Sequence, residues 1–320
     1  MGLFDGLVRR HPDYRALASA RAGLEEELAR LKQERERLAD AAEANGTWVP
    51  VRSFHSPIPS PEEISSREAE LFGKLPKELA GIELYADEQI ALLKELRKFA
   101  ADVPYKEKPE GALRFGTDNP DFGPADAAVL HCMLRKLRPR KAVAVGSGWS
   151  TLALLDSSDH SFGKALAVTV VDPAPALLRE RMRKEDVEKV RLIEKPVHAA
   201  PPDVFSALTS GDVVIADTSH VLKTGNDVHY LLGSVLPKLK QGVVVTMSSV
   251  FYPFEYPQTW AYEGRAFNEA YALRAFFTFC QAYEIVLWGS YLEQLFQPAL
   301  AKEFPLYTRS RWGSFWFKRR

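Results

Sequence analysis

Cysteine is scarce in this 320-residue chain, with Cys132 and Cys280 the only two. Two thiols are too few for a disulfide framework or a thiolate zinc site, so we expect a protein of the reducing cytoplasm. No apolar run approaches the roughly 20 residues that span a bilayer. The start, MGLFDGLVRR, lacks the apolar core of a secretory signal, and Gly6 stands where N-myristoylation needs Ser or Thr. We therefore expect neither a transmembrane segment nor export.

The chain also lacks an excess of charge of either sign. Lys and Arg total 42, and so do Asp and Glu. Without a positive excess to attract phosphates, a dedicated nucleic-acid binder is not expected. Hydrophobic residues make up 46% and charged residues 26%, which is typical of globular proteins and excludes collagen-like or wholly disordered chains.

Residues 14–43 carry a heptad pattern. Leucines recur every seven residues at Leu17, Leu24, Leu31 and Leu38. This spacing predicts a helix that pairs as a short coiled coil, and hence a homo-oligomer through residues 14–43. The alternative is a single helix lying on the globular body. Asn45 and Gly46 then provide a stop signal.

We divide the chain into residues 1–46, which hold this helix, residues 47–110, and residues 111–320. The second part opens with the proline-rich segment TWVPVRSFHSPIPSP, which favours an extended strap. Two helical patterns follow over residues 62–102. A further helix is predicted over Pro124–Leu137, with Cys132 as a core thiol.

Beyond residue 140, short β-branched runs alternate with helical patterns. This alternation predicts a doubly wound α/β fold with a mostly parallel sheet, in which ligands bind beyond the carboxyl ends of the strands. The tail, Gly313–Lys318, alternates and is predicted to form an edge strand. The other predicted strands are Lys141–Val145, Leu166–Val171, Arg191–Ile193, Asp212–Ala216, Gly242–Thr246 and Glu284–Leu287.

The first of these strands runs into a glycine turn, Gly146-Ser147-Gly148-Trp149-Ser150-Thr151. Such a turn lets a ligand approach the backbone at a helix N-terminus, and a nucleotide-like ligand is the natural candidate. Thr151 stands where the dinucleotide fingerprint has its third glycine, which argues against a nicotinamide-dependent oxidoreductase. The alternative is a tight turn without a ligand.

Two further strands deliver polar residues to the same edge of the sheet. Asp172 follows the second strand, where a carboxylate can accept hydrogen bonds from both hydroxyls of a ribose, or can merely cap the next helix. Asp217 and His220 follow the fourth strand. His220 is a candidate general base and Asp217 can position a ligand, although a lone histidine after a strand is more often structural.

The fifth strand is followed by an aromatic-rich loop with Phe251, Tyr252, Phe254, Tyr256, Trp260, Tyr262 and Phe267. A loop of this kind suits a lid that excludes water and packs on a substrate ring or sugar. The alternative is a packed surface loop or an interface. Glu255, Asn268 and Glu269 are candidate polar contacts within it.

Together, the segments VAVGSGWSTL, VVDP, VVIADTSHVLKTGNDV, LPKLKQGVVV and FYPFEYPQTW resemble class I S-adenosylmethionine-dependent methyltransferases, in particular a bacterial branch with a Pro-Phe-Glu-Tyr-Pro loop. The likeness covers most of residues 53–318. It implies a Rossmann-like fold with a seven-stranded sheet and S-adenosylmethionine as cofactor. The implied cofactor-binding residues are Gly146, Ser147, Gly148, Ser150, Asp172 and Asp217, with Asp217 and His220 facing the reaction centre.

Two positions depart from the pattern of this family. Ala144 stands where an acidic residue normally orders the cofactor loop, and Ser248-Ser249 replace a His-Asp pair. Serine hydroxyls are poor ligands for a hard cation, so no catalytic metal is expected. The sequence favours methylation of an oxygen of a small molecule or glycan precursor. The alternative is a catalytically silent scaffold that acts through its N-terminal coiled coil.

Overall fold

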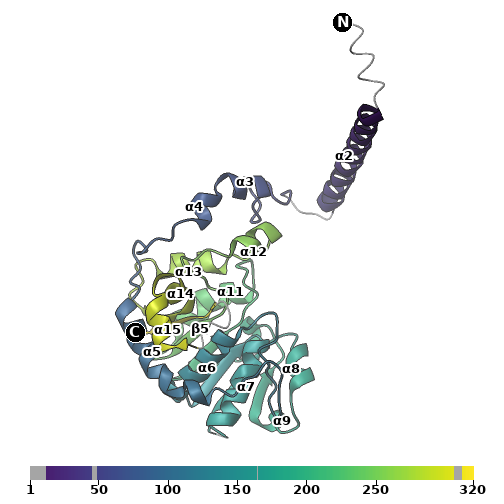
Figure 1. The fold of residues 1–320 in the computed structure, drawn as a ribbon. Coiled ribbons are helices and arrows are strands. Elements are labelled where there is room, and N and C mark those ends of the chain that lie inside the picture. Colours follow the sequence, from purple (N-terminus) through teal and green to yellow (C-terminus); the bar gives the residue numbers. More distant parts are fainter. Residues whose placement is uncertain (1–11, 45–48, 164, 306–311) are drawn as a thin grey trace, which may run out of the picture. The chain divides into compact units, whose positions relative to one another are not determined.

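The structure is a computed structural model that describes residues 12–44, 49–163, 165–305 and 312–320 (Figure 1). By its contacts, the chain divides into two compact units, residues 1–65 and 66–320. Within the described residues, no helix is long and apolar enough to cross a membrane.

The first unit contains one long helix, α2 (Pro12–Ala44), which confirms the helix predicted over residues 14–43. The predicted stop at Asn45 and Gly46 lies outside the described residues. Three of the heptad leucines of α2, Leu17, Leu24 and Leu31, are 70%, 71% and 51% exposed. A short helix, α3 (Pro61–Ser66), follows the proline-rich segment.

The second unit is built on a seven-stranded sheet with the strand order β3-β2-β1-β4-β5-β7-β6. The first five strands in this order are parallel, and β7 is antiparallel to both of its neighbours. The predicted doubly wound, mostly parallel sheet is thus confirmed. The strands are β1 (Lys141–Val145), β2 (Ala167–Val171), β3 (Val190–Ile193), β4 (Val213–Ala216), β5 (Val244–Met247), β6 (Tyr283–Trp288) and β7 (Phe315–Arg319).

Every residue of β4 and β5 is buried, because elements cover both faces of the sheet. The prediction for the position of the tail strand was wrong. The tail is not an edge strand, since β7 lies between β5 and β6. Its residues Phe315, Trp316 and Phe317 are each at most 1% exposed. An alternating pattern cannot distinguish an edge from an interior position, because both depend on which elements pack alongside.

Helices precede and connect the strands (Figure 1). The prediction for Pro124–Leu137 is confirmed by α6, in which Cys132 is fully buried and its pKa is raised to about 12 by burial. The second unit also contains α4 (Glu68–Phe72), α5 (Ala86–Leu96), η1 (Arg97–Asp102), α6 (Pro124–Leu137), α7 (Trp149–Ser161), α8 (Ala176–Arg181), α9 (Asp186–Lys189), η2 (Val197–Ala199), α10 (Asp203–Ser206), α11 (Asp227–Tyr230), η3 (Leu231–Val235), η4 (Leu236–Lys238), α12 (Gln258–Glu263), α13 (Glu269–Phe277), α14 (Gly289–Leu295) and α15 (Gln297–Glu303).

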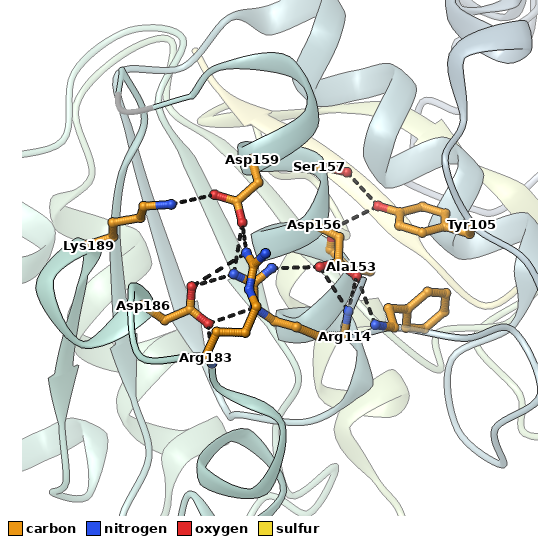
Figure 2. Close-up of polar contacts among 10 residues, drawn as sticks. Tyr105, Arg114, Ala153, Asp156, Ser157, Asp159, Arg183, Asp186 and Lys189 are labelled. Atoms are coloured by element: carbon orange, nitrogen blue, oxygen red, sulfur yellow. Dashed lines mark hydrogen bonds and ion pairs between the residues drawn. The ribbon is translucent and has the colours of Figure 1, made fainter. Parts of the chain in front are cut away.

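A buried charge cluster ties the chain ahead of α6 to α7 and α9. Figure 2 shows the Arg114 guanidinium among the carboxylates of Asp156, Asp159 and Asp186, with which it forms ion pairs. Arg183 and Lys189 add two more cations at Asp159. The cluster therefore anchors the last turns of α7, whose first turn lies at the candidate site described next.

Candidate functional site

The carboxyl ends of four parallel strands meet at one edge of the sheet. Gly146 follows β1, Asp172 follows β2, Asp217 follows β4 and Ser248 follows β5. The order along the chain reverses between β1 and β4, and this switch point is where doubly wound sheets open a crevice for ligands. The structure thus brings the predicted site residues together.

Asp217, which follows β4, approaches the β1–α7 turn so closely that Gly146 and Gly148 leave no room for a side chain. Gly146 has a φ of 93°, and a Cβ added there would lie 2.1 Å from the carbonyl oxygen of Asp217. A Cβ on Gly148 would lie 2.8 Å from Asp217 Oδ2. Thr151 donates to the carbonyl oxygen of Gly146 at 2.9 Å, a bond that the third glycine of the dinucleotide fingerprint could not make. The turn is therefore shaped to place Asp217 close to the helix N-terminus.

The Asp172 carboxylate is held at the tip of β2 by two hydrogen bonds. Ser147 Oγ donates to its Oδ2 at 2.6 Å, and the backbone N–H of Ala174 donates to its Oδ1 at 2.7 Å. It does not cap α8, which begins at Ala176 without a side-chain cap. Because each carboxylate oxygen accepts two hydrogen bonds, both oxygens keep capacity for the hydroxyls of a ligand.

Asp217 connects the first turn of α7 with the segments that follow β4 and β5. Ser150 Oγ donates to its Oδ2 and Ser248 Oγ to its Oδ1, both at 2.8 Å. Ser248 belongs to the Ser248-Ser249 pair, one of the two departures from the methyltransferase pattern noted in the sequence. The other departure, Ala144, is fully buried within β1.

His220 is oriented by a buried carboxylate on a distant element. Its Nδ1 lies 3.0 Å from Oε2 of Glu269, the first residue of α13, which is only 1% exposed. Thr218 Oγ1 donates to the other oxygen of Glu269 at 2.7 Å. With Nδ1–H donating to Glu269, the ring turns Nε2 toward Asp217 Oδ1 at 4.0 Å. This is the arrangement of a general base with an orienting carboxylate.

The backbone also holds His220 in place. Its φ is 58°, in the left-handed region that non-glycine residues seldom adopt. The N–H groups of Asn268 and Glu269 both donate to its carbonyl oxygen, at 3.0 and 3.2 Å. Strain of this kind persists where surrounding structure fixes it and is common at functional sites. The sequence indicated Glu269 only as a polar contact of the aromatic loop. Its pairing with His220 could not be predicted, because 49 residues separate the two and no local pattern links them.

The protonation of His220 reflects two opposing effects. Burial disfavours the charged imidazolium, but the hydrogen bond and charge of Glu269, together with the charges of Asp217 and Asp227, outweigh it. The pKa of His220 is therefore raised above its ordinary value. The ring becomes a stronger base, and it is neutral only above this raised pKa.

A cavity of about 420 Å³ opens beside these residues, next to the ends of β1, β2 and β4. Gly146, Asp172, His198, Asp217 and Lys223 are among its lining residues. Its size suits a nucleoside-sized ligand, and the carboxylates of Asp172 and Asp217 are part of its lining.

The aromatic loop is mostly core and only partly a cover for the site. Tyr252, Phe254 and Tyr256 are 2%, 1% and 6% exposed, so they pack inward as the alternative interpretation of this loop allowed. Phe267 is half-buried, and its ring centroid lies 5.0 Å from that of His220. The part of the loop around Phe267 is therefore the part that borders the candidate base.

Comparisons with known proteins give distant likenesses. No protein-family model matches the chain. An uncharacterized protein of Archaeoglobus fulgidus is 28% identical over 168 residues, which are 51% of this chain and 75% of that protein. The solved structure of the methyltransferase PaMTH1 of Podospora anserina, bound to SAH, is 16% identical with a TM-score of 0.42, and the match covers 82% of this chain and 98% of that one.

An apo structure of CmcI is 18% identical with a TM-score of 0.35, and the match covers 51% of this chain and 63% of that one. The chain thus spans less than two thirds of that protein. Because both TM-scores are below 0.5, the case for function rests on the residues of this chain.

Proposed function

We propose that this protein is an S-adenosylmethionine-dependent methyltransferase that acts on a hydroxyl oxygen of a small molecule or glycan precursor without a metal. The observation that carries the proposal is the joining of Asp172, Asp217 and His220 at the switch point of the sheet, beside a nucleoside-sized cavity. The seven-stranded, mostly parallel sheet is the one that the sequence resemblance implies. The expected location is the cytoplasm.

The residues of the cavity fit this cofactor in charge and shape. Asp172 has the position and the acceptor capacity to hold the ribose hydroxyls. Asp217 accepts from two serine hydroxyls, and no Lys or Arg pairs with it among the described residues. An acidic pocket of this kind favours a ligand that carries positive charge, as a sulfonium with an α-amino group does.

When bound, the cofactor supplies an electrophilic methyl group on a sulfonium. His220 Nε2 would accept the proton of the acceptor hydroxyl while the oxygen attacks that methyl group in line. Glu269 would hold the imidazole ring in place and stabilise the imidazolium that forms. Serine hydroxyls are poor ligands for a hard cation, so the Ser248-Ser249 pair supports a mechanism without a catalytic cation.

Calorimetric titration with S-adenosylmethionine and with S-adenosylhomocysteine tests the proposal, with NAD as the control ligand. We expect both compounds to bind one to one and NAD not to bind. Asp172→Asn should weaken binding about tenfold, because two charge-assisted hydrogen bonds to the ribose become neutral ones. Asp203→Asn, at an exposed carboxylate paired with Arg191, is the matched control and should leave binding unchanged. Failure of both compounds to bind at millimolar concentration would favour the scaffold function.

The second candidate function is a catalytically silent scaffold that acts through the coiled coil of α2, and the exposed leucines of this helix favour the coiled coil. Leu17, Leu24 and Leu31 lie on one seam of the helix at heptad spacing and are 51–71% exposed. A second copy of α2 is the occupant that this seam fits, with Glu27 and Lys32 able to pair between parallel chains. Deleting residues 1–45 should lower the mass measured by light scattering from oligomer to monomer, and an unchanged mass would contradict the coiled coil.

A further inference from the structure

A second cluster of ligating side chains lies away from the candidate site, where η1, α6 and α7 come together. It consists of Asp102 at the end of η1, His131 within α6 and His160 near the end of α7. One ligand atom from each residue lies within 4.8 Å of the other two. Three residues from three separate elements converge here, so the cluster is a product of the tertiary fold.

The buried member of the cluster presents a lone pair that no protein group uses. His131 is 0% exposed, and its Nε2 has no hydrogen-bond partner among the described residues. A buried ring nitrogen left in this way costs free energy, and histidine is among the residues that usually find a partner when buried. Because Nε2 lacks a protein partner, it is the free ring nitrogen that a ligand at this cluster would use.

A chain of hydrogen bonds fixes which nitrogen of His131 carries the proton. Tyr105 donates its hydroxyl proton to the carbonyl oxygen of Ala153 at 2.7 Å, so its oxygen must accept from Ser157, and Figure 2 shows both contacts of the Tyr105 hydroxyl. Ser157 Oγ therefore accepts from His131 Nδ1–H at 3.1 Å. Nε2 is left unprotonated, as in metal-binding histidines, whose other ring N–H donates to a protein oxygen.

The neighbours of Asp102 and His160 are compatible with a bound cation. Arg135 donates to Asp102 Oδ2. A carboxylate can bridge a guanidinium and a metal ion through its two oxygens. The last turn of α7, where His160 stands, also presents the negative end of the helix dipole.

We propose that Asp102, His131 and His160 form a zinc site that joins η1, α6 and α7. Two imidazoles and a carboxylate are borderline ligands that suit Zn²⁺ better than Mg²⁺ or Ca²⁺. Zinc ligands about 2.0–2.1 Å from the ion are about 3.3 Å apart in a tetrahedron. Asp102 and His160 are exposed and can close the remaining distance by side-chain rotation toward the fixed His131. Water takes the fourth position.

Equilibrium dialysis of the full, chelator-treated chain against micromolar Zn²⁺ tests this site. We expect one equivalent of zinc to bind and the melting temperature to rise by several degrees, since the ion binds only the folded chain. His160→Ala removes an exposed ligand without disturbing the core, and it should raise the dissociation constant at least tenfold and abolish the thermal shift. His229→Ala, at an exposed histidine on α11, is the matched control and should change neither quantity.

Two outcomes would overturn the zinc site. One is the failure of the wild-type chain to bind zinc, which would leave Nε2 of His131 to a buried water molecule. The other is zinc binding that survives His160→Ala and is lost in His220→Ala, which would move the ion to the candidate active site. Co²⁺ in place of Zn²⁺ adds a spectroscopic check, because a tetrahedral site gives intense visible bands that His160→Ala should remove.

Discussion

The two ends of α7 hold carboxylates in opposite electrostatic surroundings. Near its C-terminal end, three carboxylates, Asp156, Asp159 and Asp186, are matched by the cations of Arg114, Arg183 and Lys189 (Figure 2). Near its N-terminal end, Asp172 and Asp217 receive hydrogen bonds from serine hydroxyls and no Lys or Arg pairs with either within the described parts of the chain.

This difference distinguishes a cluster that stabilises the fold from one that can bind a ligand. Acidic residues near a helix C-terminus oppose the helix dipole, so the first cluster is stable only because its own cations compensate it. In the second cluster neither Asp172 nor Asp217 forms an ion pair with a Lys or Arg among the described residues, although Lys223 also lines the cavity. These carboxylates keep capacity for a cationic ligand, which is why we propose that the chemistry takes place at the N-terminal end of α7.

The largest effect on stability should come from removing the central cation of the charge-compensated cluster around Arg114, which we call the balanced cluster. Arg114→Met leaves Asp156 and Asp186 buried without their main cation, and should lower the free energy of unfolding by about 3–5 kcal/mol. Urea denaturation measures the loss. The control is Arg191→Met, which breaks an exposed pair and should cost at most about 1 kcal/mol. Equal losses of unfolding free energy in the two variants would show that the buried cluster contributes no more to stability than an exposed ion pair.

Removal of the candidate base should have the next largest effect. His220→Ala should lower turnover by a factor of ~10² or more, about 2.7 kcal/mol in transition-state free energy, and leave cofactor affinity nearly unchanged. The measurement pairs methyl transfer to an acceptor found by screening with calorimetric binding of S-adenosylmethionine. Normal turnover would remove His220 from the mechanism.

A smaller effect should follow from neutralising the orienting carboxylate. Glu269→Gln keeps the shape of the side chain but removes the charge that raises the pKa of His220. Turnover should fall about tenfold, and its rise with pH should move to lower pH. An NMR titration of the His220 ring reads the same pKa without an assay, and an unchanged midpoint would contradict the positioning role.

The two clusters should also respond to pH with opposite signs. Burial opposes ionisation of Asp186, but the hydrogen bond and charge of Arg114 outweigh it and lower its pKa, so its contribution to stability is lost as pH falls through that value. The raised pKa of His220 makes its contribution complete below the ordinary histidine pKa and lost as pH rises through the raised one. Unfolding free energies of Asp186→Asn and His220→Ala across pH, each compared with the wild type, test these signs.

The smallest effect should come from a single hydroxyl at the site. Ser248→Ala removes one of the two hydroxyl donors to Asp217, which is partly exposed and can turn to water instead. The expected loss of unfolding free energy is about 0.5–1.5 kcal/mol. A loss as large as that of Arg114→Met would mean that Asp217 depends on its serines as strongly as the balanced cluster depends on Arg114.

Much of the fold was predictable because local patterns encode it. The run Lys141–Val145 and the helix Pro124–Leu137 were predicted with the bounds that the structure has, since both end at clear signals and are buried nearly throughout. The wrong position of the tail strand has the opposite cause. Which strands flank Phe315–Arg319 depends on β5, whose residues lie 68 to 74 positions before their partners, as well as on β6.

The sequence by itself determined the seven strands, the glycine turn and the placing of Asp172, Asp217 and His220 beyond strand ends, because periodicity and strand-end position are local properties. Only the tertiary structure decided that Asp217 lies too close to Gly146 and Gly148 for a side chain there. It also decided that Glu269 orients His220 and that His131 lies near Asp102 and His160. These pairings join residues far apart in the chain. Their energies depend on distance, burial and direction, which exist only after the sheet and its helices have packed.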